Sequence, residues 1–120
     1  MILTKLIAYL GQQLNQGAEN DIYVGVEAPA EPSGYVLIDQ TGSATQNHIT
    51  TTTIAVQSYG ESLLAAYELN ETVKNAMLNF IEDNEIASVK LETDYNFTNA
   101  ATKQYRWQAV YEITHYLGGN

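Results

Sequence analysis

The sequence predicts an α+β fold, in which two helices pack on a mostly antiparallel sheet of about five strands, in the order α-β-β-β-α-β-β. Two segments repeat apolar residues at intervals of three and four, which is typical of amphipathic helices. Five other segments are rich in β-branched and aromatic residues and lie between turn-forming residues, which is typical of strands. The chain has 120 residues, of which 45% are hydrophobic, so we expect residues 1–120 to form a single domain.

The first helix is predicted over residues 2–15. Its apolar residues form one stripe, which consists of Leu3, Leu6, Ile7, Leu10 and Leu14. Gly17 follows, and glycine commonly ends a helix because it adopts the left-handed backbone conformation at no steric cost. We expect the stripe to lie on the sheet.

Two short strands are predicted on either side of a proline-containing loop. Residues 21–26 ("DIYVGV") and 35–39 ("YVLID") have the composition of strands. Both prolines of the chain lie in residues 27–34, and proline disfavours regular structure there because it fixes φ and lacks an N–H. A second loop is predicted over residues 40–47 ("QTGSATQN").

The threonine run at residues 50–53 allows more than one interpretation. A linker or a glycosylated stalk can contain repeated threonines, although a mucin-like stalk also needs proline, which this segment lacks. Threonine favours extended backbone, and the run continues directly into "IAVQS". We therefore predict one strand over residues 48–58, whose more apolar face carries Ile54 and Val56.

A second helix is predicted over residues 60–82, and a hairpin of two strands follows it. Asn70 could cap a restarted helix, and we expect a single helix that can bend at this residue. The hairpin strands are residues 86–97 and 104–117. The aromatic face of the last strand, which carries Trp107, is expected to meet the helices.

Composition excludes several classes of protein. The chain has no cysteine, which excludes disulfides, zinc–thiolate sites, iron–sulfur clusters and a thiol nucleophile. It has 14 acidic and 5 basic residues and a net charge of −9. Nucleic acids and anionic membranes require clustered lysine and arginine, so we expect neither as a direct partner. No segment approaches the ~18 apolar residues of a membrane span, and the expected compartment is the cytoplasm.

No set of residues predicts a catalytic or metal-binding site. His48 and His115 lack further ligands at metal-binding spacing. Glu92 and Asp94 would share one face of a strand, but such a pair arises by chance in a chain with 14 acids. Phosphate-binding loops, nucleophile elbows and dinucleotide fingerprints are missing. We therefore expect no enzymatic activity, no cofactor and no bound metal.

The nine tyrosines exceed what a core of this size usually needs. Tyrosine combines an apolar ring with a polar hydroxyl, and it suits surfaces that are partly buried and partly wet. Two uses stay open, namely packing on the sheet with the hydroxyl at its edge, and contact with another protein. Arg106, one of only five bases, is a candidate ion-pair donor beside Trp107, which is expected in the core.

Four segments in this order carry a resemblance to a known family and cover nearly the whole chain. They are the N-terminal helix, the proline-containing "VGVEAPAEPSGYVLID", the threonine-rich strand that runs into "SYGES" and an amphipathic helix, and the closing "YRWQAVYEI". In this layout the chain resembles the tail-terminator and head–tail joining (minor tail) proteins of long-tailed bacteriophages.

The resemblance implies a structural protein of the virion. Such proteins form a ring, typically six-fold, on the end of the tail tube, where they stop polymerisation and offer a surface to the head connector. The implied partners are further copies of the chain, the tail tube protein and the connector protein. The implied location is the head-proximal end of the tail, after assembly in the host cytoplasm. The loops at residues 27–34 and 40–47 are then the candidate contact segments.

The residues predicted to lie at an interface are Glu27, Glu31, Tyr35, Gln46, His48, Tyr105 and Arg106. The main alternative is a non-catalytic α+β domain of a bacterial protein that binds a partner or a ligand and has no role in a virion. An enzyme is the third hypothesis and would need a cleft around Glu92 and Asp94.

Overall fold

A computed structural model describes residues 2–15, 22–28, 34–80 and 86–116. Its elements in chain order are α1 (Ile2–Leu14), β1 (Tyr23–Gly25), β2 (Tyr35–Gln46), β3 (Ile49–Gly60), α2 (Leu63–Asn79), β4 (Ile86–Asn96) and β5 (Tyr105–Tyr116). This order confirms the predicted α+β fold.

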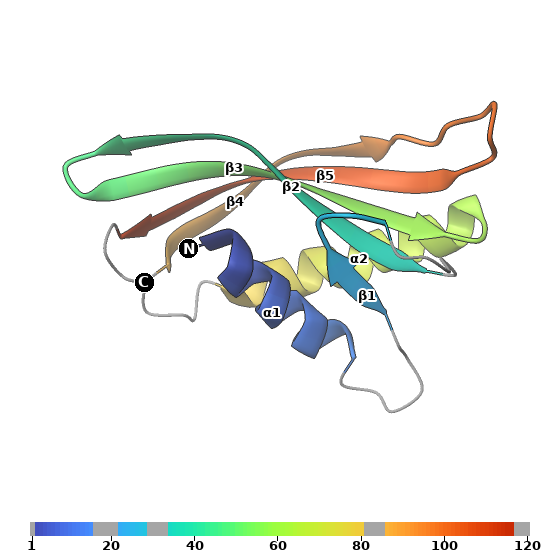
Figure 1. The fold of residues 1–120 in the computed structure, drawn as a ribbon, viewed down its shortest axis with the longest axis horizontal. Coiled ribbons are helices and arrows are strands. Elements are labelled where there is room, and N and C mark those ends of the chain that lie inside the picture. The colour runs from blue at the N-terminus through green and yellow to red at the C-terminus, as the bar shows by residue number, and fades with distance from the viewer. Residues whose placement is uncertain (1, 16–21, 29–33, 81–85, 117–120) are drawn as a thin grey trace.

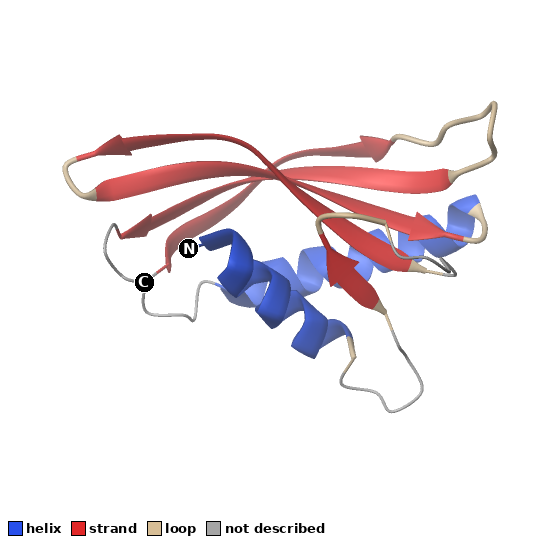
Figure 2. Cartoon of the chain, in the orientation of Figure 1, coloured by secondary structure: helices blue, strands red, loops and turns tan. Residues whose placement is uncertain are grey.

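The five strands form one sheet in the order β1-β2-β3-β5-β4. β1 runs parallel to β2, whereas the other neighbouring pairs are antiparallel. The predicted hairpin of the last two strands is confirmed, because β4 pairs with β5. Both helices lie on one side of the sheet (Figures 1 and 2), which we call the inner face, and the opposite side is the outer face.

The hydrophobic core lies between the inner face and the helices. Ile54 and Val56 of β3 are fully buried there, which confirms both the strand interpretation of the threonine segment and the face predicted to be apolar. Tyr111 and Ile113 of β5 are buried on the same side. The predicted stripe of α1 contributes Leu6, Leu10 and Leu14 to this core.

α1 packs on α2 as well as on the sheet. The prediction that its apolar stripe lies on the sheet is therefore incomplete. The hydroxyl of Tyr9 donates a hydrogen bond of 2.6 Å to the carbonyl oxygen of Ala76 in α2. The Tyr9 ring also lies 4.9 Å from the ring of Phe80, centroid to centroid. These contacts fasten the two helices to each other.

The predicted loop at residues 40–47 is wrong, because β2 continues to Gln46. The threonine run of β3 pairs with this segment, and a β-bulge precedes Gly42. Only Asn47 and His48 form the turn, with φ values of 54° and 67°, as the tight hairpin turns that match strand twist require. The local residues resemble a loop, but pairing with a strong strand overrides their weak intrinsic preference.

α2 begins at Leu63, later than predicted, because Gly60 still belongs to β3. Ser62 caps the helix, and its hydroxyl accepts a hydrogen bond of 3.1 Å from the N–H of Ala65. A Cβ atom on Gly60 would lie 2.6 Å from the backbone nitrogen of Ala66. Glycine is therefore what allows the strand to pass so close to the first turn of the helix.

Asn70 does not cap a restarted helix. α2 runs from Leu63 to Asn79 with Ser62 as its cap, and Asn70 is fully buried in its middle. Asparagine favours helix caps and is mostly exposed in proteins, so its residue type does not predict a buried position in the middle of a helix.

The sheet is longer than the helices that cover it. β2, β3 and β5 each have 12 residues and span about 40 Å at ~3.3 Å per residue. α2 has 17 residues and spans only about 25 Å. The distal parts of β2 and β3 with their turn, residues 39–53, therefore extend past the helices (Figure 1). We call this segment the arm, and every residue from Asp39 to Ile49 in it is exposed.

Candidate functional site

A pocket of about 430 Å³ lies at the end of the sheet opposite the arm, where β2 and β5 begin and β3 ends. Its lining residues are Tyr35, Tyr59, Gly60, Glu61, Asn99, Thr102, Lys103, Gln104 and Tyr105. We call it the tyrosine pocket. Two of the predicted interface residues, Tyr35 and Tyr105, line it.

The pocket is built on a pair of stacked tyrosines. Tyr35 and Tyr59 are register partners on β2 and β3, and their ring centroids lie 4.4 Å apart with an interplanar angle of 11°. Both are buried, with only 4% and 5% of their surface exposed. Burial, together with the neighbouring Tyr59, raises the pKa of the Tyr35 hydroxyl, because a low-dielectric site disfavours the phenolate. Tyr35 is therefore a neutral hydroxyl at physiological pH.

Arg106 lies beside the tyrosine pocket. Its guanidinium lies against aromatic rings and donates hydrogen bonds to oxygen atoms. Its guanidinium carbon is 4.4 Å from the centroid of Phe97 and 5.8 Å from that of Tyr59, within the range of cation–π attraction. Its Nε donates to the Phe97 carbonyl oxygen at 2.6 Å, and its Nη1 donates to the Tyr59 hydroxyl at 3.1 Å. These contacts hold the guanidinium in place, and its predicted role as an ion-pair donor to a partner stays a prediction.

A row of hydrogen bonds continues from Tyr59 across the sheet. The Tyr59 hydroxyl donates to Oε1 of Gln57 at 2.7 Å, and Nε2 of Gln57 donates to Oε1 of Gln108 at 2.7 Å. Nε2 of Gln108 then donates to the hydroxyl of Tyr95. The row joins β3, β5 and β4 through side chains, and it fixes the stacked pair relative to the neighbouring strands.

The turn between β4 and β5 forms one wall of the pocket. Asn99 and Gln104 exchange backbone hydrogen bonds of 3.1 Å, and the Asn99 side chain accepts from the N–H of Ala101 at 3.1 Å. Lys103 in this turn has a φ of 55°, which is uncommon for a residue with a side chain. With Glu61, Lys103 gives the pocket lining one charge of each sign.

The other predicted interface residues do not gather at the tyrosine pocket. Gln46 lines a second hollow of about 460 Å³ at the tip of the arm, and His48 lies in the turn of the arm. Glu27 is exposed after β1, and Glu31 lies outside the described residues. The residues predicted from the sequence therefore lie at both ends of the sheet. The prediction did not distinguish the tyrosine pocket from the arm.

Sequence reasoning missed Tyr59 and Lys103 as pocket residues. The stacking partner of Tyr35 depends on the register of β2 and β3, which extends through the segment predicted as a loop. The strained turn at Lys103 leaves no local signal, because lysine does not usually mark positive φ. The one relevant signal in the sequence is the number of tyrosines, which exceeds what a core of this size usually needs.

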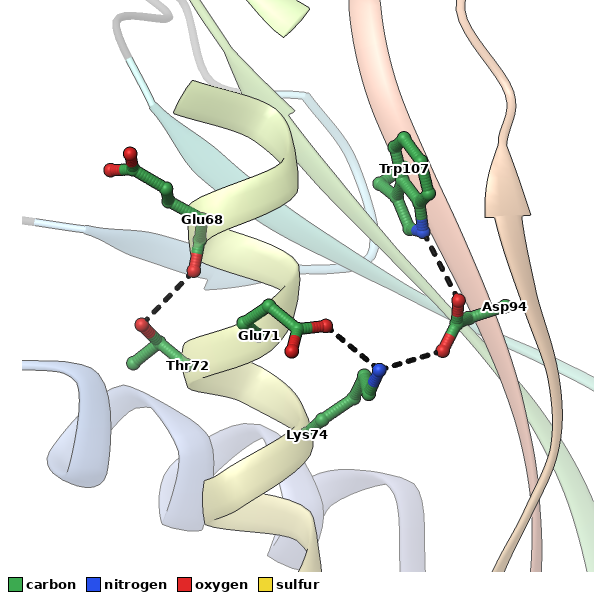
Figure 3. Close-up of polar contacts among 6 residues, drawn as sticks. All are labelled: Glu68, Glu71, Thr72, Lys74, Asp94 and Trp107. Carbon is green, nitrogen blue, oxygen red and sulfur yellow. Dashed lines mark hydrogen bonds and ion pairs between the residues drawn. The ribbon is translucent and has the colours of Figure 1, made fainter. Parts of the chain in front are cut away.

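A second polar cluster joins α2 to β4 on the inner face (Figure 3). Nζ of Lys74 lies 2.8 Å from a carboxylate oxygen of Glu71 and 2.9 Å from one of Asp94. The indole N–H of Trp107 donates to the other oxygen of Asp94 at 3.3 Å. Hydrogen bonds to Glu71 and Asp94 raise the pKa of Lys74 to about 12. The bond from Lys74 in turn lowers the pKa of Asp94.

The expected placement of Glu92 and Asp94 on one face of a strand is wrong. A β-bulge separates Leu91 from Thr93 and shifts the alternation of side chains by one residue. Asp94 therefore meets Lys74 on the inner face, whereas Glu92 lies 3.6 Å from Lys90. The two carboxylates have different partners and form no pair.

No protein-family model and no curated protein matches the chain. Among the described residues, no group of three or more histidines and acids is placed to hold a metal ion. No described helix has the length and apolar character needed to cross a bilayer.

Proposed function

We propose that this chain is a structural virion-assembly protein that resembles the phage tail terminators. It would cap the tail tube as a ring of identical subunits and join the tube to the head connector. The sequence layout supports this proposal, and the arm is the structural observation that carries it. An ordered strand pair that is exposed without interruption from Asp39 to Ile49 is suited to contact another protein chain.

The composition of the arm supports a role in contacts. The chain carries a net charge of −9, but no aspartate, glutamate, lysine or arginine occurs between Gln40 and Gly60. Like charges repel when acidic surfaces meet. Beyond Asp39 at its base, the arm is therefore a projection without charged Asp, Glu, Lys or Arg side chains, where two acidic chains can approach at the lowest electrostatic cost.

The positions of the arm and the tyrosine pocket also suit a ring. A cyclic assembly joins two different surfaces of neighbouring subunits. The arm and the tyrosine pocket are different in chemistry and lie at opposite ends of the same long strands. This arrangement favours a head-to-tail contact over a symmetric dimer.

Light scattering over a wide range of protein concentration, with and without magnesium, tests the proposal. We expect the mass to rise with concentration towards a six-fold species. Ala44→Glu, which adds a charge to the arm, should keep the chain monomeric. Asn75→Glu adds the same charge to the exposed surface of α2 and should leave the mass unchanged. A stable wild-type dimer would contradict the proposal.

A second candidate function is a partner- or ligand-binding domain, and the tyrosine pocket favours it. Its volume of about 430 Å³ lies within the range of small-molecule sites. This function predicts a mass that does not change with concentration. It also predicts that a small aromatic acid such as benzoate shifts the NMR signals of Tyr35 and Lys103, and that Tyr59→Ala abolishes these shifts.

A further inference from the structure

Within the described part of the chain, four buried side-chain polar atoms on α2, β3 and β5 have no hydrogen-bond partner. They are Nδ2 and Oδ1 of Asn70, Oγ of Ser58 and the hydroxyl oxygen of Tyr111. Asn70 and Ser58 are fully buried, and Tyr111 is 2% exposed. Over 90% of buried polar groups in folded proteins have a partner, so four such atoms in one interface require an explanation.

The neighbours of Asn70 place these atoms in one region. One turn before Asn70, the Tyr67 ring packs edge-on against Trp107 of β5, with centroids 5.2 Å apart. One turn after it, Lys74 binds Asp94, which pairs with Ala109 of β5. Asn70 therefore lies over the part of β5 around Ala109.

Ser58 and Tyr111 lie on either side of Ala109 along the direction of the strands. Ser58 is the register partner of Trp107, two residues before Ala109, and Tyr111 is two residues after it. Ala109 is fully buried and has only a methyl side chain. A small residue therefore lies between Ser58 and Tyr111 on the sheet, opposite Asn70 of α2, so no large side chain fills the space between the three polar groups.

The chemistry of the unpaired atoms selects the occupant. An amide N–H₂ donates, an amide oxygen accepts, and each hydroxyl can do both, so the occupant must also donate and accept. Burial raises the pKa of Tyr111, which keeps its hydroxyl neutral. A buried water makes about three hydrogen bonds, and one or two waters therefore match the four atoms. None of the three side chains carries a charge that would attract an ion.

We propose that ordered water occupies a site between α2 and the inner face, bound by Asn70, Ser58 and Tyr111. We call it the Asn70 site. The middle of α2 is then attached to the sheet through a polar, hydrated contact. The apolar core continues on the C-terminal side of Asn70, where Val73 and Met77 of the same helix are buried.

A crystal structure of the full chain at better than about 1.5 Å tests the site directly, because ordered waters are visible there. We expect ordered water that bonds both Asn70 and Ser58 and extends to the Tyr111 hydroxyl. In solution, the Asn70 side-chain amide should show a nuclear Overhauser effect to water with a long residence time. An Asn70 amide that bonds directly to protein atoms, or that turns out to solvent, would overturn the proposal.

A double-mutant cycle provides a second test. Asn70→Leu should lower the midpoint of thermal unfolding, because Ser58 and Tyr111 lose the water that links them to α2. Adding Ser58→Ala to Asn70→Leu should recover part of that loss, although Ser58→Ala alone lowers the midpoint. Strictly additive shifts would show that the two residues share no water and would overturn the proposal.

Discussion

β2 and β3 run without a break from the half of the sheet that the helices cover into the arm. The two regions are stabilised by different interactions. Under the helices, residues such as Ile54 and Val56 are fully buried, and stability comes from apolar surface removed from water. In the arm, the same two strands have an exposed surface from Asp39 to Ile49. They are held by backbone pairing and by small contacts such as the 2.8 Å hydrogen bond between the Thr45 and Thr50 hydroxyls. Buried residues under the helices therefore maintain the fold, whereas exposed residues of the arm are available to contact another chain.

The largest expected difference between the two regions is the cost of truncating a side chain. Leu10→Ala should lower the free energy of unfolding by about 2–5 kcal/mol, because Leu10 is fully buried and a cavity remains. Ile49→Ala in the arm should cost about 0.5 kcal/mol or less, since exposed positions tolerate change. Urea denaturation measures both. Equal losses would show that the arm is packed against something in solution.

Two glycines, one in each region, should differ in how well they tolerate alanine. Gly60→Ala should destabilise the chain by about 1–3 kcal/mol, because overpacking forces the backbone apart. The new Cβ would meet the first turn of α2 at 2.6 Å. Gly42→Ala in the arm is the matched control, since nothing lies within 4 Å of its Cβ position. It should be neutral or slightly stabilising, and a large loss at Gly42 would contradict the open environment assigned to the arm.

The dependence of stability on pH should come from the helix-covered half through Lys74 and Asp94. The folded pKa of Asp94 is lowered from its ordinary value of 3.8, so its stabilisation is present above that value and is lost as pH falls through the folded pKa. The folded pKa of Lys74 is about 12, so its contribution is lost as pH rises through that value. Because both groups are partly exposed, the effect should be about 1 kcal/mol or less.

Acid titrations of the unfolding free energy measure this contribution. Asp94→Asn should reduce the fall in stability at low pH, whereas Glu92→Asn, which removes an acid from the same strand, should not. Parallel acid curves for the Asp94 variant and the wild type would show that the ion pair does not form.

The smallest expected effect is a gain in the arm. His48 has a φ of 67°, where a side chain is strained and glycine is not. His48→Gly should therefore stabilise the hairpin, by at most about 1 kcal/mol. Ala44→Gly, at a strand position of the same arm, should be destabilising instead. A loss of stability in the His48 variant would indicate that the imidazole makes a contact that holds the turn.

The helices and the order of elements could be predicted because their signals are local. The stripe of α1 and the alternation in β3 follow from spacing alone, and both meet the core as expected. The arm could not be predicted from "QTGSATQN", since its strand character comes from pairing with residues 49–54. The tyrosine pocket depends on the same register and on the turn at Lys103, so the sequence supplied three of its residues or neighbours, Tyr35, Tyr105 and Arg106, without their arrangement.

Because the arm carries no Asp, Glu, Lys or Arg beyond Asp39, its contacts should respond to salt differently from charged surfaces. Ions screen charges over about 10 Å at 0.1 M ionic strength, so they weaken the repulsion between chains that each carry −9. Between Gln40 and Gly60 there is no Asp, Glu, Lys or Arg, so ions have no such charge to screen within that segment. Contacts made by the arm should therefore become stronger as salt is added, which is the opposite of what charge-paired interfaces do.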